Sequence, residues 1–539
     1  MSKYFTFILS TIVGCFFISK IQSQNVNNVL RDTYYYPNQT CANVWGYVDS
    51  LGNEYALVGA RNGMSIVNVT NPDSIWQVMQ IAGPQNLWKE IRTFGHYAYC
   101  TSEGGSGLQI INLRNLPDTN LQHHYWAPTI LGTTLNKIHA LHIDTATAYI
   151  YLYGCNGGFD GTLIAKLNDP YNPTYRGKYG DGSNYVHDGI VRNNIMYASQ
   201  IYFGTVTFVD VSVDNSPTTI ISKHTPGNFT HNTWLSTDSK YLFTTDEIDN
   251  SYLTCYNIED LQNIELVDKI QSNPSSNSVV HNTYYKDGYC FTSWYRDGYT
   301  IVDASHPNNL IQVGNYDAYD GSGGGTSGTW GVYAYLPSGN VLLTNIDSSS
   351  IAPGGGVLTV VTPTLQRGCY LEGNVVDSLS NLPLSNVTIT ANSVSNSFID
   401  QNTLSGDYAT GTVQSDLYNI IFSKPGYISK TYNNVALSNG VTTNLYVKLL
   451  NDSVNRLEEL VSKNNISIIN NSNKTITIKS TLVNTKINVK LIDGIGNQIK
   501  SKYIYSTLET LYFTDVSSGI YYLVFTNENK GTIVYKVSL

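Results

Sequence analysis

Two stretches of the sequence share one design: FTHNTWLSTDSKYLFTTDE at residues 229–247 and VVHNTYYKDGYCFTSWYRDG at residues 279–298. In each, a histidine, an asparagine and a threonine precede a short polar turn and a second run of β-branched and aromatic residues. Such runs, separated by Gly, Asn, Asp and Ser, are typical of strands joined by tight turns. The pair therefore predicts a repeated strand–turn–strand unit in which His231 and His281 are equivalent.

Seven units of this design follow one another along the chain, spaced roughly 40 to 50 residues apart. Their first strands are NVWGYV at Asn43, NLWKEI at Asn86, KIHALH at Lys137, YVHDGI at Tyr185, FTHNTW at Phe229, VVHNTY at Val279 and GTWGVY at Gly328. A second and a third strand follow each opening, and a fourth strand follows in all units but the last. This pattern predicts an all-β chain with a seven-bladed β-propeller over residues 24–365.

The closure of the predicted ring involves both of its ends. The last unit lacks a fourth strand, and the segment VLRDTYYY at residues 29–36 has no unit of its own, so we expect this segment to supply the missing outer strand. Cys41 and Cys369 flank the propeller, and closure would bring the ends together, which predicts a disulfide between them. The cysteines inside predicted strands are expected to be buried apolar residues: Cys100, Cys255 and Cys290.

The aligned openings place one residue of each unit at an equivalent position near one end of the central channel. These residues are Trp45, Trp88, His139, His187, His231, His281 and Trp330. The turns after the second strands lie at the same mouth, and Asp188 stands next to His187. The residues that these turns contribute are Glu103, Asp160, Asp246, Glu247, Arg296 and Asp297. The sequence thus predicts histidines, carboxylates and tryptophans around one opening.

Three interpretations of this ring stand side by side. Imidazole and carboxylate groups are ligands for Zn²⁺, Mn²⁺ or, for the carboxylates, Ca²⁺. The candidate metal ligands are His139, His187, His231, His281, Asp188, Asp246 and Glu247. Alternatively, the mouth is a platform for a sugar or a peptide. The candidate contacts of such a ligand are Trp45, Trp88, Trp330, Glu103 and Arg296. In the third interpretation, each imidazole only ties a first strand to its neighbour.

The beginning of the chain and its charge bear on where the protein acts. Residues 1–23 combine an early lysine with an apolar run that turns polar, which predicts a secretory signal peptide. Cys15 in IVGC leaves open the alternative of a lipoprotein signal. The later sequence contains no apolar stretch long enough to predict a transmembrane helix. A net charge of -9, with only 13% charged residues, argues against nucleic acid as a partner.

The C-terminal third changes to alternating strands with Asn, Ser and Gly turns, which predicts two small β-sandwich domains. Residues 366–450 are similar to carboxypeptidase regulatory-like domains, through LEGNVVDSLSNLPLSNVTI and KPGYISKT. Residues 451–539 resemble the C-terminal sorting domain of the bacterial type IX secretion system, through KINVKLIDGIGNQIKSK and VSSGIYYLVFTNENKGTIVYKVSL. This resemblance implies the type IX secretion machinery as a partner and a secreted or outer cell-surface location.

The propeller resembles the choice-of-anchor B family, whose repeats carry an LVIVD-like third strand, seen here as SIVNV, QIINL, TFVDV and TIVDA. The resemblance implies a surface or extracellular protein and brings no catalytic residues with it. We therefore expect a binding module for a glycan, a peptide or a surface protein. The alternatives are a metal-dependent hydrolase or polysaccharide lyase that uses the histidines, and a purely structural surface component.

Overall fold

The computed structural model describes residues 25–130, 132–157, 159, 161–180, 184–321, 324–347, 355–452, 466–471, 474–480, 486–527 and 531–539. The predicted signal peptide and Cys15 lie outside these residues. Strands make up nearly all of the regular secondary structure of the described chain, which confirms the all-β prediction. It forms two compact units, Met1–Cys369 with Gly411–Val413, and Tyr370–Thr410 with Gln414–Leu539.

The described part of the first unit contains seven four-stranded antiparallel sheets, each with its strands in chain order except the last. The first four are β2(Cys41–Val48) β3(Glu54–Ala60) β4(Gly63–Asn68) β5(Trp76–Ala82); β6(Ile91–Phe94) β7(Tyr97–Cys100) β8(Leu108–Asn112) β9(His123–Trp126); β12(Ala140–Asp144) β13(Tyr149–Tyr153) β14(Thr162–Lys166) β15(Thr174–Tyr179); and β16(Asp188–Arg192) β17(Ile195–Gln200) β18(Thr205–Asp210) β19(Thr218–His224). The others are β20(Thr230–Leu235) β21(Tyr241–Asp246) β22(Leu253–Asn257) β23(Glu265–Ile270); β24(Val280–Lys286) β25(Tyr289–Trp294) β26(Gly298–Asp303) β27(Ile311–Tyr316); and β28(Thr329–Tyr333) β29(Val341–Asn345) β30(Gly356–Pro363) β1(Asn28–Tyr36). Two short insertions complete the unit: the hairpin β10(Thr129–Ile130) β11(Thr133–Thr134) and the 3₁₀ turn η1(Ile201–Phe203).

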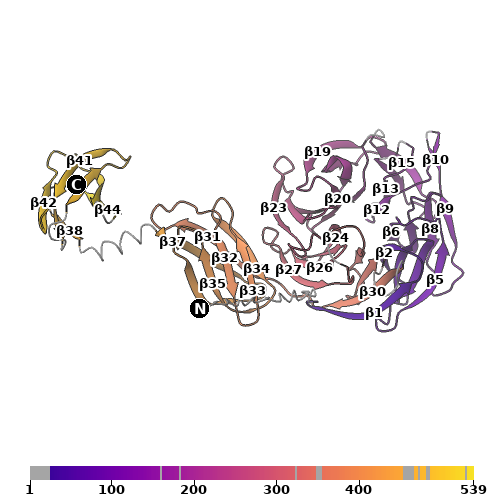
Figure 1. The fold of residues 1–539 in the computed structure, drawn as a ribbon. Coiled ribbons are helices and arrows are strands. Elements are labelled where there is room, and N and C mark those ends of the chain that lie inside the picture. The colour runs from indigo at the N-terminus through magenta and orange to yellow at the C-terminus, as the bar shows by residue number, and fades with distance from the viewer. Residues whose placement is uncertain are drawn as a thin grey trace, which may run out of the picture. The chain divides into compact units, whose positions relative to one another are not determined.

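The sheets are arranged around a common axis, with the first strand of each sheet innermost (Figure 1). Each inner strand contacts the inner strand of the next sheet, in the order β2, β6, β12, β16, β20, β24 and β28, and β28 contacts β2. A ring of sheets that closes in this way is the β-propeller arrangement, in which few strand edges stay open. The β-propeller arrangement predicted from the repeat is therefore confirmed.

Strand β1 closes the ring in the way the sequence predicted. It pairs antiparallel with β30 as the outer strand of the last sheet, from Asn28 opposite Pro363 to Tyr36 opposite Gly356. The hydroxyl of Tyr36, which is fully buried, donates a hydrogen bond of 3.0 Å to Ser65 Oγ in the first sheet. One N-terminal segment thus completes the last sheet and fastens it to the first.

The hydrophobic core of this unit is divided into clusters that lie between neighbouring sheets. One cluster joins Leu342 and Leu358 of the last sheet to Val44 and Val58 of the first, and it includes Tyr36 of β1. Similar clusters fill the spaces between the other neighbouring sheets for which they are described. Burial of apolar surface between sheets holds the ring together and leaves the inner strands to line the channel.

The cysteines do not form the disulfide predicted between Cys41 and Cys369, because both thiols are free. Cys41 is buried in β2, and a Cβ added at Gly356 would lie 2.5 Å from its sulfur. Cys369 follows Arg367 and Gly368, which both bind Asp303 of the sixth sheet. The Cys41 thiol belongs to the apolar cluster between the last and first sheets, whereas the Cys369 thiol lies 4.0 Å from the carbonyl oxygen of Val413. The predicted burial of the strand cysteines is confirmed for Cys100, Cys255 and Cys290.

The second unit contains two pairs of sheets. The first pair consists of β34(Asp407–Thr412) β31(Cys369–Asp377) β37(Thr442–Leu449) and β33(Ser397–Gln401) β32(Thr388–Asn392) β35(Asp416–Ser423) β36(Lys430–Leu437), with β31 and β37 parallel. The second pair consists of β38(Ile466–Asn471) β39(Thr475–Ser480) β42(Leu508–Tyr512) and β41(Gln498–Ile504) β40(Ile487–Ile492) β43(Ile520–Asn527) β44(Gly531–Ser538). Among the described residues, no helix is long and apolar enough to span a membrane.

Candidate functional site

Three residues of the channel ring lie at irregularities in the pairing of the first two strands of a sheet. The register shifts between Thr230 and Asn232, between Val280 and Thr283, and between Thr329 and Gly331. A β-bulge of this kind re-aims the side chain that it contains. The ring residues held in these three irregularities are His231, His281 and Trp330.

The first sheet has the same irregularity, between Cys41 and Val44, so its ring residue is Ala42 and not Trp45. A hydroxyl from the preceding sheet marks the same position. Thr344 donates to the Ala42 carbonyl at 2.5 Å. The corresponding bonds run from Thr101 to His139 O, from Thr245 to His281 O and from Ser293 to Trp330 O. The sequence alignment was therefore wrong by three residues in this unit.

In the second sheet the ring position belongs to Lys89, one residue after Trp88. The amide of Ile91, two residues beyond Lys89, donates to Asn43 Oδ1 of the preceding sheet at 3.3 Å. In the sixth sheet, the amide of Thr283, two residues beyond His281, donates in the same way to Asn232 Oδ1. Lys89 is therefore the equivalent of His281. Lys89 is buried, and its ammonium donates to the carbonyls of Arg61, Pro84 and Asn86. Burial lowers its pKa.

The aromatic side chains of the ring form a continuous arc. The ring centroids lie 4.1 Å apart for His139 and His187, 4.3 Å for His187 and His231, and 4.3 Å for His231 and His281. The arc continues from His281 to Trp330 at 4.3 Å and from Trp330 to Trp88 at 6.4 Å. The structure therefore brings together all four predicted histidines and two of the three predicted tryptophans.

Backbone carbonyls fix the protonation of two of these imidazoles. His187 Nδ1 lies 3.2 Å from the carbonyl oxygen of His231, and His281 Nδ1 lies 2.8 Å from that of Trp330. A carbonyl oxygen only accepts, so each Nδ1 carries the proton and each Nε2 keeps a lone pair. Burial, together with the neighbouring imidazoles, lowers the pKa of both side chains well below the usual value. Both are neutral and able to act as nitrogen ligands.

His187, His231 and Glu247 form the one group of potential metal ligands among the described residues, with their ligand atoms within 4.8 Å of one another. His231 Nε2 lies 3.6 Å from Glu247 Oε2, while its Nδ1 is buried without a hydrogen-bond partner in the described chain. The other carboxylate oxygen, Oε1, accepts a hydrogen bond of 2.6 Å from the Tyr295 hydroxyl. Burial raises the pKa of Glu247 to about 7, and burial with the charge of His139 lowers the pKa of His231 to about 3.

His139 differs from the other ring histidines because it pairs with a carboxylate. Its Nδ1 lies 2.5 Å from Glu103 Oε1, and Glu103 is the more exposed of the two. Burial would lower the pKa of His139, but the hydrogen bond and charge of Glu103, with the charges of Glu90 and Asp188, outweigh burial and raise it. The hydrogen bond to His139 lowers the pKa of Glu103. This pair places an imidazole bonded to a carboxylate at the edge of the group formed by His187, His231 and Glu247.

Other predicted ligands have different partners. Asp246 accepts hydrogen bonds from the side chain of Thr225 and from the amides of Gly227 and Phe229, so it holds the loop before β20. Asp188 is buried and accepts from Asn232 Nδ2 at 2.7 Å. Arg296 donates to the Tyr319 hydroxyl, and Asp297 accepts from Ser272 and Ser276. Asp160 lies outside the described residues.

Trp45 belongs to a second layer of the channel that the sequence did not predict. Three residues beyond the ring position, Arg92 lies over the ring of Trp45 at 4.2 Å and over that of Tyr284 at 5.8 Å. Trp234 packs against Tyr284 at 4.8 Å. Arg92 also binds Glu90, whose pKa is raised to about 7 by burial. Aromatic side chains and one ion pair thus fill this part of the channel. Its one sequence signal was Arg92, the residue directly after the opening NLWKEI.

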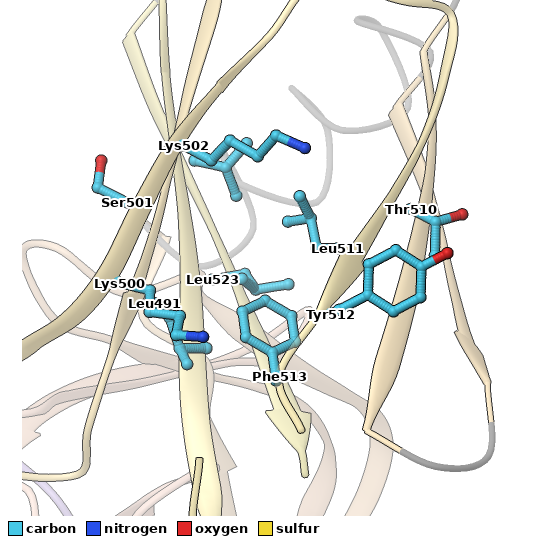
Figure 2. Close-up of a pocket in the computed structure, with 10 residues that line it drawn as sticks. Leu491, Lys500, Ser501, Lys502, Thr510, Leu511, Tyr512, Phe513 and Leu523 are labelled. Carbon is cyan, nitrogen blue, oxygen red and sulfur yellow. The ribbon is translucent and has the colours of Figure 1, made fainter. Parts of the chain in front are cut away.

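A pocket of about 350 Å³ in the second unit lies apart from this chemistry (Figure 2). It opens between β41 and β42 over the core residues Leu491, Leu511 and Leu523. The two lysines at its rim are neutralised, since Lys500 pairs with Asp515 and Lys502 with Glu509. The pocket is therefore an uncovered edge of a sheet-on-sheet core rather than a charged binding site.

No family model and no curated protein matches the chain. Among solved structures, the chain is similar to the β-propeller domain of Cps50 (Swd1) from Myceliophteria thermophila, with 10% identity, coverage of 62% of this chain and 100% of that one, and a TM-score of 0.43. It is also similar to a putative 6-phosphogluconolactonase from Bacteroides uniformis, with 11% identity, coverage of 57% and 89%, and a TM-score of 0.41.

Proposed function

We propose that this protein is an exported β-propeller that binds its ligand at the histidine end of the channel, through a divalent metal held by His187, His231 and Glu247. The observation that carries the proposal is the convergence of two neutral imidazoles and one carboxylate within 4.8 Å. Three ligands of this kind leave one position of a tetrahedral ion open for a bound group. The function is binding, with the metal as the point of attachment.

The distances within the group support this proposal. Two ligands of a tetrahedral ion, with bonds of about 2.0 to 2.1 Å, lie about 3.4 Å apart. The 3.6 Å between His231 Nε2 and Glu247 Oε2 is close to that spacing and is too long for a good hydrogen bond. Tyr295 orients Glu247 from behind, as groups bonded to metal ligands do. The third ligand, His187, has its ligand atom within 4.8 Å of those of His231 and Glu247.

The donor set favours zinc among the candidate metals. Two nitrogens and one carboxylate oxygen suit Zn²⁺ and, less well, Mn²⁺. Ca²⁺ prefers six to eight oxygen ligands, which this group does not offer. The carboxylates that would have favoured calcium, Asp188 and Asp246, are bound elsewhere.

The open coordination position supports a second candidate function, a metal-dependent hydrolase or polysaccharide lyase. In that case the metal would polarise a substrate oxygen or activate a water. The His139–Glu103 pair, at 2.5 Å, would supply a proton donor beside it. The purely structural alternative rests on the bonds from His187 and His281 to backbone carbonyls, which tie each sheet to the next.

The remaining parts of the proposal concern architecture and location. We infer that each of the seven sheets around the axis is a blade, and that residues 366–450 and 451–539 form two β-sandwich domains, since each range contains a pair of sheets. The resemblance of residues 451–539 to type IX sorting domains supports recognition by that secretion machinery. With the predicted signal peptide, it supports a secreted or outer cell-surface protein.

Titration with Zn²⁺ tests the proposed function. The purified chain, stripped with a chelator, is expected to bind close to one equivalent of zinc in calorimetry and to retain it in elemental analysis. A His187→Ala, His231→Ala double variant should bind none, whereas Glu103→Gln, at the same mouth but outside the group, should keep the metal. Absence of zinc binding by the folded wild-type chain would leave the histidines as ties between sheets.

A further inference from the structure

The mouth of the channel is chemically divided. The third to sixth sheets contribute imidazoles, with Glu103 and Glu247 beside them. The opposite side is apolar: Trp88 and Leu87 pack against a buried cluster that includes Trp330, Tyr295 and Ile346. A ligand bound to the proposed metal therefore faces polar groups on one side and aromatic surface on the other.

The apolar side has the geometry of an aromatic contact surface. The rings of Trp88 and Trp330 are stacked with an angle of 30° between their planes. Trp88 stays partly exposed, whereas Trp330 is only 3% exposed. Flat aromatic faces of this kind bind other flat apolar groups.

A second observation points to a ligand at this surface. The indole nitrogen of Trp330, Nε1, is buried and has no hydrogen-bond partner among the described residues. A buried N–H group without an acceptor costs free energy, so native proteins usually supply one. An oxygen of a ligand lying against Trp330 would accept this bond.

The aromatic surface and the proposed metal group lie within reach of one small molecule. His281 stands between them, with its ring centroid 4.3 Å from that of His231 on one side and 4.3 Å from that of Trp330 on the other. A ligand attached near His231 therefore spans little more than one imidazole before it meets Trp330. This span suits a coordinating group with a ring directly attached.

We infer that the ligand of this site is a small molecule that carries an aromatic ring next to an anionic, metal-coordinating group. This inference rests on the proposed function, because the anionic group binds the metal held by His187, His231 and Glu247. The ring lies against Trp88 and Trp330, and an oxygen of the coordinating group accepts the indole N–H of Trp330. Polyols, which lack both features, bind weakly here.

Two hydroxamates test this inference, because they share the coordinating group and differ in the ring. Benzohydroxamate and acetohydroxamate are titrated by calorimetry into the zinc-loaded full chain. Benzohydroxamate is expected to bind about 10-fold more tightly than acetohydroxamate, because its ring gains contact with one aromatic surface. Trp88→Ala should abolish this preference, so that benzohydroxamate binds no more tightly than acetohydroxamate. Trp76→Ala, which removes a half-exposed tryptophan from β5, is the matched control and should keep the preference.

The outcomes separate this inference from the proposed function. If the chain binds no zinc, both fail. If zinc binds but the two hydroxamates have equal affinity, only the aromatic ligand class is overturned. A preference that survives Trp88→Ala overturns the assigned surface, and a preference that survives removal of zinc overturns the coordinated anionic group.

Discussion

The Tyr295 hydroxyl donates a hydrogen bond of 2.6 Å to Glu247 Oε1, and the other oxygen of the same carboxylate faces His231 Nε2 at 3.6 Å. The sixth sheet thereby orients a carboxylate that follows the second strand of the fifth sheet. Tyr295 is itself fully buried, and its ring packs on His281 at 5.1 Å. The carboxylate is therefore held in place before any metal arrives.

Removal of this orienting bond should weaken the metal site without destroying it. Tyr295→Phe keeps the packing against His281 and deletes only the hydroxyl. Loss of a group that orients a metal ligand typically costs about 10- to 100-fold in affinity, and we expect a loss of that size for zinc in calorimetry. Tyr319→Phe, which removes a hydroxyl bonded to Arg296, is the control and should not change it. Equal zinc affinity in Tyr295→Phe and wild type would contradict the proposed role of Glu247.

The neighbouring carboxylates Asp246 and Glu247 should respond in opposite ways to neutralisation. Asp246 accepts hydrogen bonds from Gly227 N at 2.9 Å and Phe229 N at 3.1 Å, so Asp246→Asn breaks part of this set and should lower the free energy of unfolding by about 1 to 3 kcal/mol. Glu247→Gln should leave stability nearly intact and abolish zinc binding. Urea unfolding and zinc titration of both variants check the expectation. If Asp246→Asn abolishes zinc binding and Glu247→Gln does not, Asp246 is the ligand.

The sequence predicted the ring most accurately where its own repeat was most regular. The pattern of histidine, asparagine and threonine at His231 and His281 placed these residues correctly, because each lies in a bulge of the first strand of its own sheet. In the first unit the alignment placed Trp45, the one tryptophan of the opening, at the ring position. The bulge between Cys41 and Val44, which selects Ala42, depends on pairing with β3, and its one sequence signal is Asn43, which follows Ala42 as Asn232 and Asn282 follow the histidines.

The choice between adjacent carboxylates was also beyond the sequence. Asp246 is the last residue of β21 and turns toward the loop at residues 225–229, whereas Glu247 turns toward the channel. Which of the two faces inward depends on where the strand ends, and sequence patterns fix the ends of elements poorly. Strand β1 was predictable because counting the strands of each unit showed that the last unit lacked its outer strand.

The closing strand should depend on Tyr36 more than on its neighbours. Tyr36 is 1% exposed and bonds to Ser65 across two sheets. Tyr36→Ala should lower the free energy of unfolding by about 3 to 5 kcal/mol, as expected for a large buried aromatic residue, and Tyr36→Phe by about 1 kcal/mol for the lost hydrogen bond. Tyr35→Ala, at a position 37% exposed, serves as the control with little effect in urea unfolding. Similar losses at both positions would argue against a special closing role.

The free thiols of Cys41 and Cys369 lead to a chemical prediction. Each is buried, and burial raises the pKa of both thiols, so neither reacts readily in the folded chain. After unfolding in denaturant without reductant, both should be alkylated completely, as peptide mass spectrometry can show. A disulfide-linked pair of peptides that contain Cys41 and Cys369 would instead support the disulfide predicted from the sequence.

His142 should make the propeller sensitive to acid. It lies in the second layer of the channel, against Trp234, with a ring separation of 6.1 Å. Burial, with the positive charges of Arg92 and Arg192, lowers its pKa to about 3. The unfolded chain binds this proton near pH 6.5 and the folded chain does not, so stability is complete above about pH 6.5 and declines as the pH falls toward 3.

The variant His142→Phe isolates this contribution from that of the other buried histidines. Between pH 7.5 and pH 5.0, one histidine with these properties accounts for about 2 kcal/mol of lost stability. The free energy of unfolding in urea should therefore fall by about 2 kcal/mol less in His142→Phe than in wild type over the same interval. His224→Phe, at an exposed position on β19, should show the wild-type dependence. If acidification destabilises His142→Phe as much as wild type, His142 is protonated in the folded protein, and the second layer of the channel admits a charge beside Arg92.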